Sequence, residues 1–250
     1  MRKIYPFKGI LYNQDKLTTL ADVVTPPYDV ISADMQDELY ERSPYNFCRV
    51  DYTKEEGPER YDVAGRSFAN WLSQNVFVQE REPALYVHHH SFTLPDGRKI
   101  VRKGFFAARR IEGFSEGSIK PHEKTLEGPK TDRLLLTRAT HCHLSPVFAL
   151  YADPEHQVSQ CFARLTQTTP FVDFMSHDGE RHQVWRLKDQ KAFSTVDGFL
   201  SARPLFIADG HHRYETALNY RNEVRAQNPN LTEDSAVNQL LMYFSNMNDD

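Results

Sequence analysis

The chain has 250 residues, of which 40% are hydrophobic and 26% are charged, so it can bury a core of its own. Its formal net charge is −4, whereas proteins that neutralise many nucleic-acid phosphates usually carry a basic excess. Nucleic acid is therefore not expected as a partner. The three cysteines show no C-x-x-C spacing, which indicates reduced thiols. Neither a secretory signal nor an apolar stretch of membrane-spanning length is found, so a cytoplasmic protein without membrane contact is expected.

The first third of the chain predicts a strand, a helix, a second strand and an amphipathic helix, over residues 4–12, 33–42, 46–52 and 58–75. Ser32 is placed to cap the first of these helices. Pro26 and Pro27 exclude a helix before it, because each proline fixes its own φ and lacks an N–H group.

The middle of the chain predicts a β-hairpin over residues 84–93 and 99–111, with Pro95-Asp96-Gly97 as its turn. Residues 112–133 contain glycines and prolines among charged residues, which predicts a long polar loop of the kind that often forms a lid or binding site. Further strands are predicted at 146–151, 182–187, 204–208 and 240–244, and a helix at 154–168.

The strongest functional signal is the turn Asp209-Gly210-His211-His212-Arg213, where an apolar strand ends and a helix begins. Asp209 is a natural N-cap, and Gly210 lets a ligand approach the backbone closely. The start of a helix presents unpaired N–H groups and a partial positive charge, which suits an anion. Arg213 adds a planar fork of donors that matches two phosphate oxygens. The turn therefore predicts a phosphate-binding site.

His211 and His212 can supply further donors to such a site. Without a ligand the helix end favours their neutral forms, whereas a bound polyphosphate favours the charged ones. The alternative interpretation is an ordinary capped helix whose histidines lie on the surface.

The stretch Asp209–Ala217 resembles the phosphate-binding turn of the ParB/sulfiredoxin superfamily, which includes ATP-using sulfiredoxins, CTP-hydrolysing ParB proteins and archaeal free-serine kinases. The kinases carry a closely similar Asp-Gly-His-His-Arg. The wider chain resembles the family called domain of unknown function 1015, in the turn itself and in the stretches Tyr5–Gly9, Pro26–Ile31, Ser43–Asn46, Pro121–Thr125, Asp132–Leu134 and Ser145–Phe148.

These resemblances imply an α+β (mixed α/β) fold with a ParB/sulfiredoxin-like nucleotide-binding core, an inserted β-hairpin and a long polar loop. We expect one domain over residues 1–250. Family members usually continue well past this point, so the chain is expected to be the N-terminal part of a longer architecture.

Asp29 follows the rigid Pro26-Pro27 turn and is a candidate general base or magnesium ligand. Free-serine kinases use an acidic residue from their N-terminal part as base, so this role comes from the resemblance. Asp209 competes for the same role. The alternative for Asp29 is a purely structural turn.

The polar loop carries His122, Glu123 and Lys124. Together with Arg133 these residues are predicted to close over an anionic substrate, unless the loop is merely solvated. The zinc-protease motif H-E-x-x-H is not met, because Leu126 stands where the second histidine is required.

Histidines also occur in two alternating pairs, His88 with His90 and His141 with His143. Each pair shares one face if its segment is extended. Four histidines can form a zinc site, but nothing in the sequence brings the two pairs together. Histidines packed within strands are the simpler interpretation, and no metal ligand is assigned.

The leading hypothesis is a phosphotransferase that uses ATP, ADP or another nucleotide with Mg²⁺ and acts on a small hydroxylated metabolite such as free serine. One alternative is a ParB-like protein in which the nucleotide controls association with a partner, and another is a histidine-ligated metal hydrolase. The oligomeric state is left open. The candidate catalytic residues are Asp209, Asp29, His122 and Glu123, and the candidate nucleotide-binding residues are Gly210, His211, His212, Arg213, Lys124 and Arg133.

Overall fold

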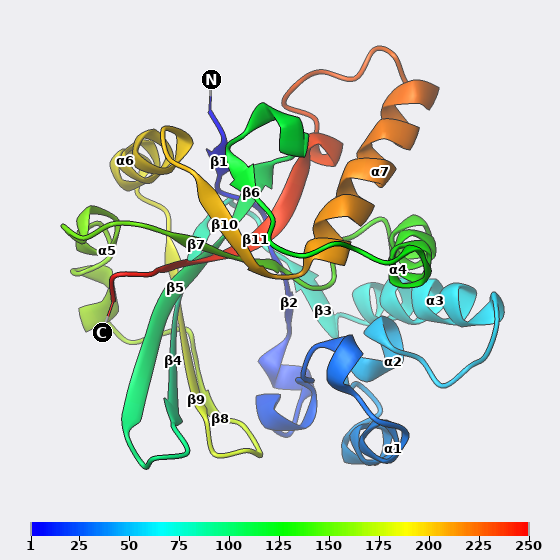
Figure 1. Ribbon diagram of the computed structural model, residues 1–250. Helices are drawn as coiled ribbons and strands as arrows, with labels where there is room; N and C mark the ends of the chain where they lie inside the picture. Colours follow the sequence, from blue (N-terminus) through cyan, green and yellow to red (C-terminus); the bar gives the residue numbers. More distant parts are fainter. Residues whose placement is uncertain (1, 250) are drawn as a thin grey trace.

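The computed structural model describes residues 2–249, except for the side chain of Glu116. Its central feature is a nine-stranded sheet (Figure 1). The strands follow the order β6 (Ile119–Lys120), β10 (Leu205–Asp209), β7 (Val147–Tyr151), β11 (Gln239–Asn246), β5 (Lys99–Arg110), β4 (Leu85–Thr93), β9 (Arg181–Leu187) and β8 (Val172–Met175), with β1 (Ile4–Tyr5) paired to β5. The pairs β6–β10 and β7–β11 are parallel and the others antiparallel. The expected mixed α/β class is confirmed.

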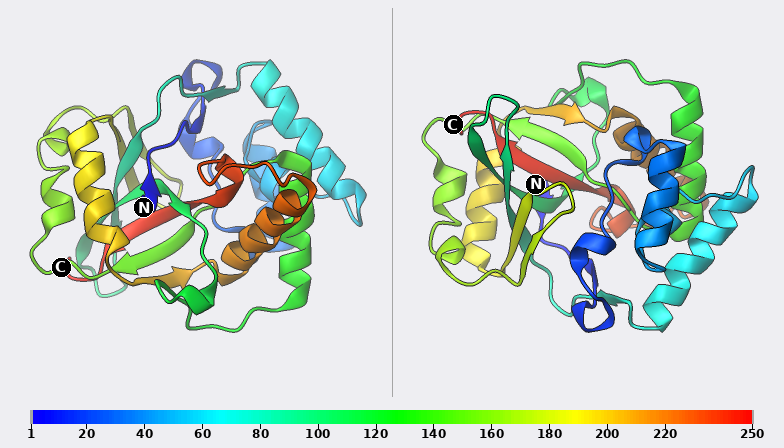
Figure 2. Two further views of the ribbon diagram at one scale, coloured as in Figure 1. Left: turned by 90° about the horizontal axis from the view of Figure 1, so that it is seen from above. Right: turned by 90° about the horizontal axis from the view of Figure 1, so that it is seen from below.

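The helices divide between two sides of the molecule, with the sheet between them (Figure 2). On one side lie α5 (Gln157–Gln160) and α6 (Gln190–Ser201). On the other lie α3 (Glu59–Ser73), α4 (Glu127–Thr140) and α7 (His211–Gln227), together with α1 (Ala33–Arg42), α2 (Cys48–Asp51) and the small sheet of β2 (Ile10–Tyr12) and β3 (Phe77–Gln79). Within residues 2–249, every helix is too short or too polar to cross a bilayer.

The main hydrophobic core lies against the large sheet. Phe105, Met242 and Phe244 are fully buried in it. Tyr214 and Ala217, on the inner face of α7, belong to the same core. Burying one such large side chain stabilises the fold by roughly 1.5–3 kcal/mol. This core holds the start of α7 firmly against the sheet.

Several predicted elements are confirmed. Ser32 Oγ accepts a hydrogen bond from the Met35 amide at 3.2 Å, so α1 begins where its cap predicts. The predicted amphipathic helix is α3, and the predicted hairpin is β4 with β5. Strand 240–244 is β11, which is paired on both sides, with β5 and with β7.

Residues 46–52 were expected to form a strand, which is wrong: they contain the short helix α2. Asn46 starts this helical turn, because its side-chain oxygen accepts from the Cys48 amide at 3.0 Å and its NH₂ group donates to the Asp22 carbonyl at 2.8 Å. Asn46, Cys48 and Val50 are all fully buried. The alternation in the sequence therefore marks burial correctly, although the element is a helix.

Three other predicted elements differ from expectation. The strand at 4–12 is split into β1 and β2, and the helix at 154–168 is reduced to α5 and a separate 3₁₀ turn over Leu165–Gln167. The polar loop at 112–133 is interrupted by β6, and its last residues belong to α4. Pro129 is compatible with α4 because the first three N–H groups of a helix have no partner within it.

Candidate functional site

The turn between β10 and α7 has the geometry of an open helix start. Gly210 is the N-terminal residue flanking α7, in the left-handed region at φ 89°, and no side chain caps the helix. Only glycine adopts this conformation without strain, and a Cβ atom there would lie 3.0 Å from Arg213 Nε and 3.3 Å from the Val147 backbone. The predicted role of Asp209 as N-cap is wrong. Asp209 is the last residue of β10, and its carboxylate turns to Arg213 instead.

Arg213 is held by protein groups on both arms of its guanidinium. One nitrogen donates to the Pro146 carbonyl and the other to the Asp209 carboxylate. The Arg213 side chain is 11% exposed, whereas that of Asp209 is 53% exposed. The charge of Arg213 thus faces a carboxylate that solvent can reach.

The loop that follows β6 rests on the two histidines of the turn. The His122 amide donates to His211 Nε2 at 3.3 Å, and the Leu126 amide donates to His212 Nε2 at 3.0 Å. Both Nε2 atoms are therefore acceptors. Burial lowers the pKa of His211, and the nearby His122 lowers it further. The neutral form expected for His211 without a ligand agrees with this environment.

The same loop is tied to the second turn of α7. Thr125 Oγ1 donates to the Glu215 carboxylate at 2.6 Å, and Lys130 Nζ, from the start of α4, lies 3.1 Å from the same carboxylate. The Glu123 side chain is exposed, and one of its carboxylate oxygens lies 3.4 Å from His211 Nδ1. The predicted loop residues His122 and Glu123 are thus brought next to the turn.

Arg133 does not lie in the polar loop, as was expected, but inside α4. Its guanidinium forms a buried ion pair with Asp51 at 2.9 Å and contacts Asp132 at 2.6 Å. It also lies 3.8 Å from the centroid of the Tyr28 ring. The Pro26-Pro27 turn therefore packs its aromatic end on Arg133. Asp29, the next residue, is exposed on the 3₁₀ turn Tyr28–Val30.

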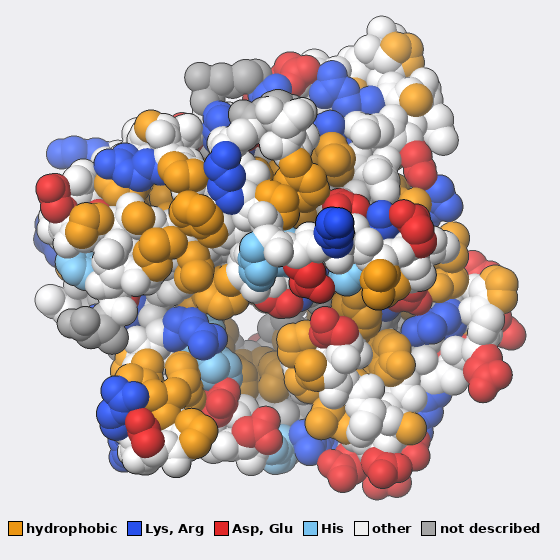
Figure 3. Space-filling view, in the orientation of Figure 1, with side chains coloured by type: hydrophobic (Ala, Val, Ile, Leu, Met, Phe, Trp, Pro, Cys, Tyr) orange, Lys and Arg blue, Asp and Glu red, His pale blue; other side chains and the backbone are white. Residues whose placement is uncertain are grey.

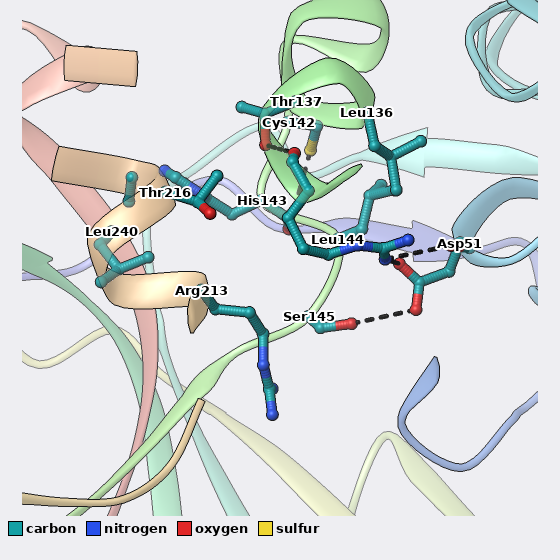
Figure 4. A pocket seen from close by; sticks show the side chains of 12 residues that line it. Asp51, Leu136, Thr137, Cys142, His143, Leu144, Ser145, Arg213, Thr216 and Leu240 are labelled. Atoms are coloured by element: carbon teal, nitrogen blue, oxygen red, sulfur yellow. Dashed lines mark hydrogen bonds and ion pairs between the residues drawn. The ribbon is translucent and has the colours of Figure 1, made fainter. Parts of the chain in front are cut away.

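A small cavity lies between α2, α4 and α7 and is lined in part by Asp51, Ser145 and Arg213 (Figure 4). Ser145 Oγ donates to Asp51 Oδ2 at 3.3 Å, and the Arg213 side chain extends from α7 past Ser145. The cavity volume is about 30 Å³, which is enough to hold a water molecule. Burial raises the pKa of Asp51, and Arg133 partly offsets this effect. No local motif marks Asp51, so the sequence did not identify it.

Other predicted residues lie apart from this cluster or at its surface. Lys124 is exposed in the loop. His141 and His143 are not joined with His88 and His90: His141 Nδ1 is 3.0 Å from the Tyr220 hydroxyl, and His143 Nε2 is 3.0 Å from the Gln239 carbonyl. The four-histidine zinc site is therefore not formed.

The fold and this cluster define a mixed α/β protein in which a sheet presents an uncapped helix start beside an arginine. The chain matches the family described as "Protein of unknown function (DUF1015)" over residues 4–250, and it belongs to this family. No curated protein and no solved structure matches it.

Proposed function

We propose that the start of α7 binds the phosphates of a nucleotide, with Mg²⁺, and that the chain transfers a phosphoryl group to a small hydroxylated metabolite such as free serine. The observation that carries the proposal is the uncapped helix start at Gly210, with Arg213 directly beside it. Helix N–H groups and a guanidinium together are the donors that phosphate oxygens require. The resemblance of Asp209–Ala217 to the ParB/sulfiredoxin phosphate turn supports both this ligand and a core of that type.

Binding exchanges one anion on Arg213 for another. The Asp209 carboxylate now accepts from the guanidinium, and it is the more exposed partner of the pair. A phosphate oxygen takes its place on Arg213 and also accepts from the free N–H groups of the helix. Since both ligands are anions, the charge of Arg213 stays compensated throughout the exchange.

Asp209, once released, is available for chemistry at the same site. Its exposed carboxylate fits a magnesium ligand, because Mg²⁺ is usually held by one or two carboxylates and the phosphates of the substrate. When bound, the ion neutralises charge on the transferred group. In the transfer, the acceptor oxygen bonds to phosphorus, the bond from phosphorus to the bridging oxygen of the nucleotide breaks, and Asp209 or Asp29 accepts the proton of the acceptor hydroxyl.

The polar loop encloses the acceptor in this proposal, through His122, Glu123 and Lys124. A polyphosphate favours protonated His211, and protonation of Nε2 removes the acceptor that the His122 amide uses. The loop therefore shifts when phosphate binds. This link also favours a second candidate function, in which the nucleotide controls association with a partner without turnover.

A nucleotide panel tests the proposal. ATP, ADP, CTP and tripolyphosphate are added to the chain with and without Mg²⁺, and the melting temperature is followed, because a ligand that binds the folded state stabilises it by mass action. A rise is expected for wild type, a loss of that rise for Arg213→Ala, and an unchanged rise for Arg138→Ala, which removes an exposed arginine of α4. An undiminished rise in Arg213→Ala contradicts the site.

Turnover then separates the two candidate functions. The chain is incubated with ATP or ADP and pooled hydroxylated metabolites, serine included, and phosphorylated products are detected by mass spectrometry. A phosphorylated product supports the transferase. Stabilisation by nucleotide without any product supports the gated binding protein.

A further inference from the structure

A second group of side chains converges on the neighbouring strands β4 and β9. His90 and His182 are directly opposite each other in the antiparallel register, so both project from the same face of the sheet. Glu180 lies just before β9, and one of its carboxylate oxygens is 2.6 Å from His90 Nε2. One ligand atom from each of the three residues lies within 4.8 Å of the other two.

Two imidazoles and a carboxylate are a ligand set that zinc accepts in open, three-ligand sites. With zinc–ligand distances near 2 Å, ligand atoms around a tetrahedral ion are about 3.3 Å apart. Side-chain shifts of roughly 1 Å bring the three atoms to that spacing. His90 and Glu180 are 16% and 39% exposed, so an ion can reach them from solvent and keep a position for water.

His88 supports this arrangement through its contact with His182. Its Nε2 lies 3.1 Å from His182 Nδ1, and the two rings are stacked with centroids 5.4 Å apart. When His182 Nδ1 donates to His88, the Nε2 lone pair of His182 is free for a metal; zinc-bound histidines usually donate their other ring N–H in this way, and here the acceptor is an imidazole.

We infer that His90, Glu180 and His182 bind a divalent transition-metal ion, with Zn²⁺ as the best match, and that His88 positions His182. The inference does not depend on the phosphate site.

An aromatic path nevertheless connects the two regions: His88 contacts Tyr243, and Tyr243 contacts Phe148, the register partner of Asp209. The face of the molecule drawn in Figure 3 is hollowed at its middle, with histidine side chains above and below the hollow.

Zinc titration of the full chain, without a histidine tag and after removal of metal by a chelator, tests the inference. Calorimetry is expected to give one Zn²⁺ per chain with a Kd at or below about 1 µM. His182→Gln and Glu180→Gln are expected to weaken binding at least tenfold, and His88→Gln about 10–100-fold. His156→Gln is the matched control, since His156 pairs with a single carboxylate, that of Asp249, at 3.0 Å.

Two results overturn the inference: a wild-type chain that binds no Zn²⁺ at micromolar concentration, or binding that is equal in wild type, His182→Gln and Glu180→Gln. Circular dichroism without zinc shows whether each variant is folded. If a variant is unfolded, wild type loaded with Co²⁺ decides instead, because a four-coordinate site with imidazole ligands gives intense visible absorption and its absence refutes the site. No nucleotide is present, so failure here is separate from failure of the phosphate proposal.

Discussion

Arg133 and Arg213 both hold an aspartate, but the two pairs differ in how far solvent reaches the carboxylate. Asp51, the partner of Arg133, is 4% exposed, whereas Asp209, the partner of Arg213, is 53% exposed. Arg133 also forms an ion pair with Asp132 and lies over the ring of Tyr28. A buried charge without its partner is strongly destabilising, whereas an exposed one is solvated by water. The Arg133 pair is therefore fixed in place, whereas the Arg213 pair is the one that exchanges its anion in the proposed function.

Arg133→Met gives the largest effect expected from this comparison. The substitution keeps an unbranched, flexible stem but leaves the buried Asp51 carboxylate without its cation. The free energy of unfolding, measured by urea denaturation, is expected to fall by about 3–5 kcal/mol.

Arg138→Met is the control for this substitution, because Arg138 lies on the same helix in a pair with Glu223 in which both side chains are substantially exposed. Its effect is expected to stay within about 1 kcal/mol. Equal losses in the two variants contradict the claim that burial of the carboxylate separates the pairs.

Glu112→Gln extends the comparison to another buried arginine pair. Glu112 Oε2 lies 3.1 Å from Arg109 and Oε1 lies 2.7 Å from Lys3. Burial favours the neutral acid, but hydrogen bonds from Lys3 and Ser118 and the charge of Arg109 outweigh it and lower the pKa of Glu112. The ionised group therefore stabilises the fold above the usual glutamate pKa, and this stability is lost as the pH falls through the lower pKa of the folded state.

The substitution is expected to lower the free energy of unfolding by about 2 kcal/mol at pH 7. This value lies within the range for a hydrogen bond to a charged group. The difference from wild type should shrink as the pH falls below the ordinary glutamate pKa of about 4.3 and through the lower pKa of the folded state. Urea denaturation at several pH values measures it. A difference that does not change with pH assigns the loss to packing and not to the charge of Glu112.

The sequence predicted those features that depend on neighbouring residues. Ser32 begins α1, the Pro95-Asp96-Gly97 turn joins β4 and β5, and the glycine at the start of α7 lies where a strand passes into a helix. Each signal lies within a few residues of the element that it defines.

Features that depend on distant residues were missed. Asp51 and Arg133 are 82 residues apart, and His90 and His182 are 92 apart, so only tertiary packing brings either pair together. Asp209 was mistaken for a helix cap because a cap and an arginine partner use the same carboxylate. The loop prediction for Arg133 failed because Gly128 and Pro129 are typical of loops but are also tolerated in the first turn of α4.

Asp209→Asn tests whether the exposed partner competes with phosphate. An amide holds the guanidinium more weakly than a carboxylate, so tripolyphosphate without Mg²⁺ is expected to bind about fivefold tighter, which corresponds to about 1 kcal/mol. Calorimetry measures the change. Asp173→Asn is the control, because it frees an exposed arginine, Arg181, on another strand. Unchanged affinity in Asp209→Asn means that Arg213 does not exchange its anion.

His212→Ala gives the smallest effect and tests whether the loop depends on the turn. The substitution removes the acceptor that holds the Leu126 amide at 3.0 Å, a bond worth about 1 kcal/mol. Hydrogen exchange at Leu126, followed by NMR, is expected to become about fivefold faster. His141→Ala, which affects an exposed histidine bonded to Tyr220, should leave this exchange rate unchanged. If Leu126 exchanges equally fast in wild type and His212→Ala, the histidine does not hold the loop through this bond.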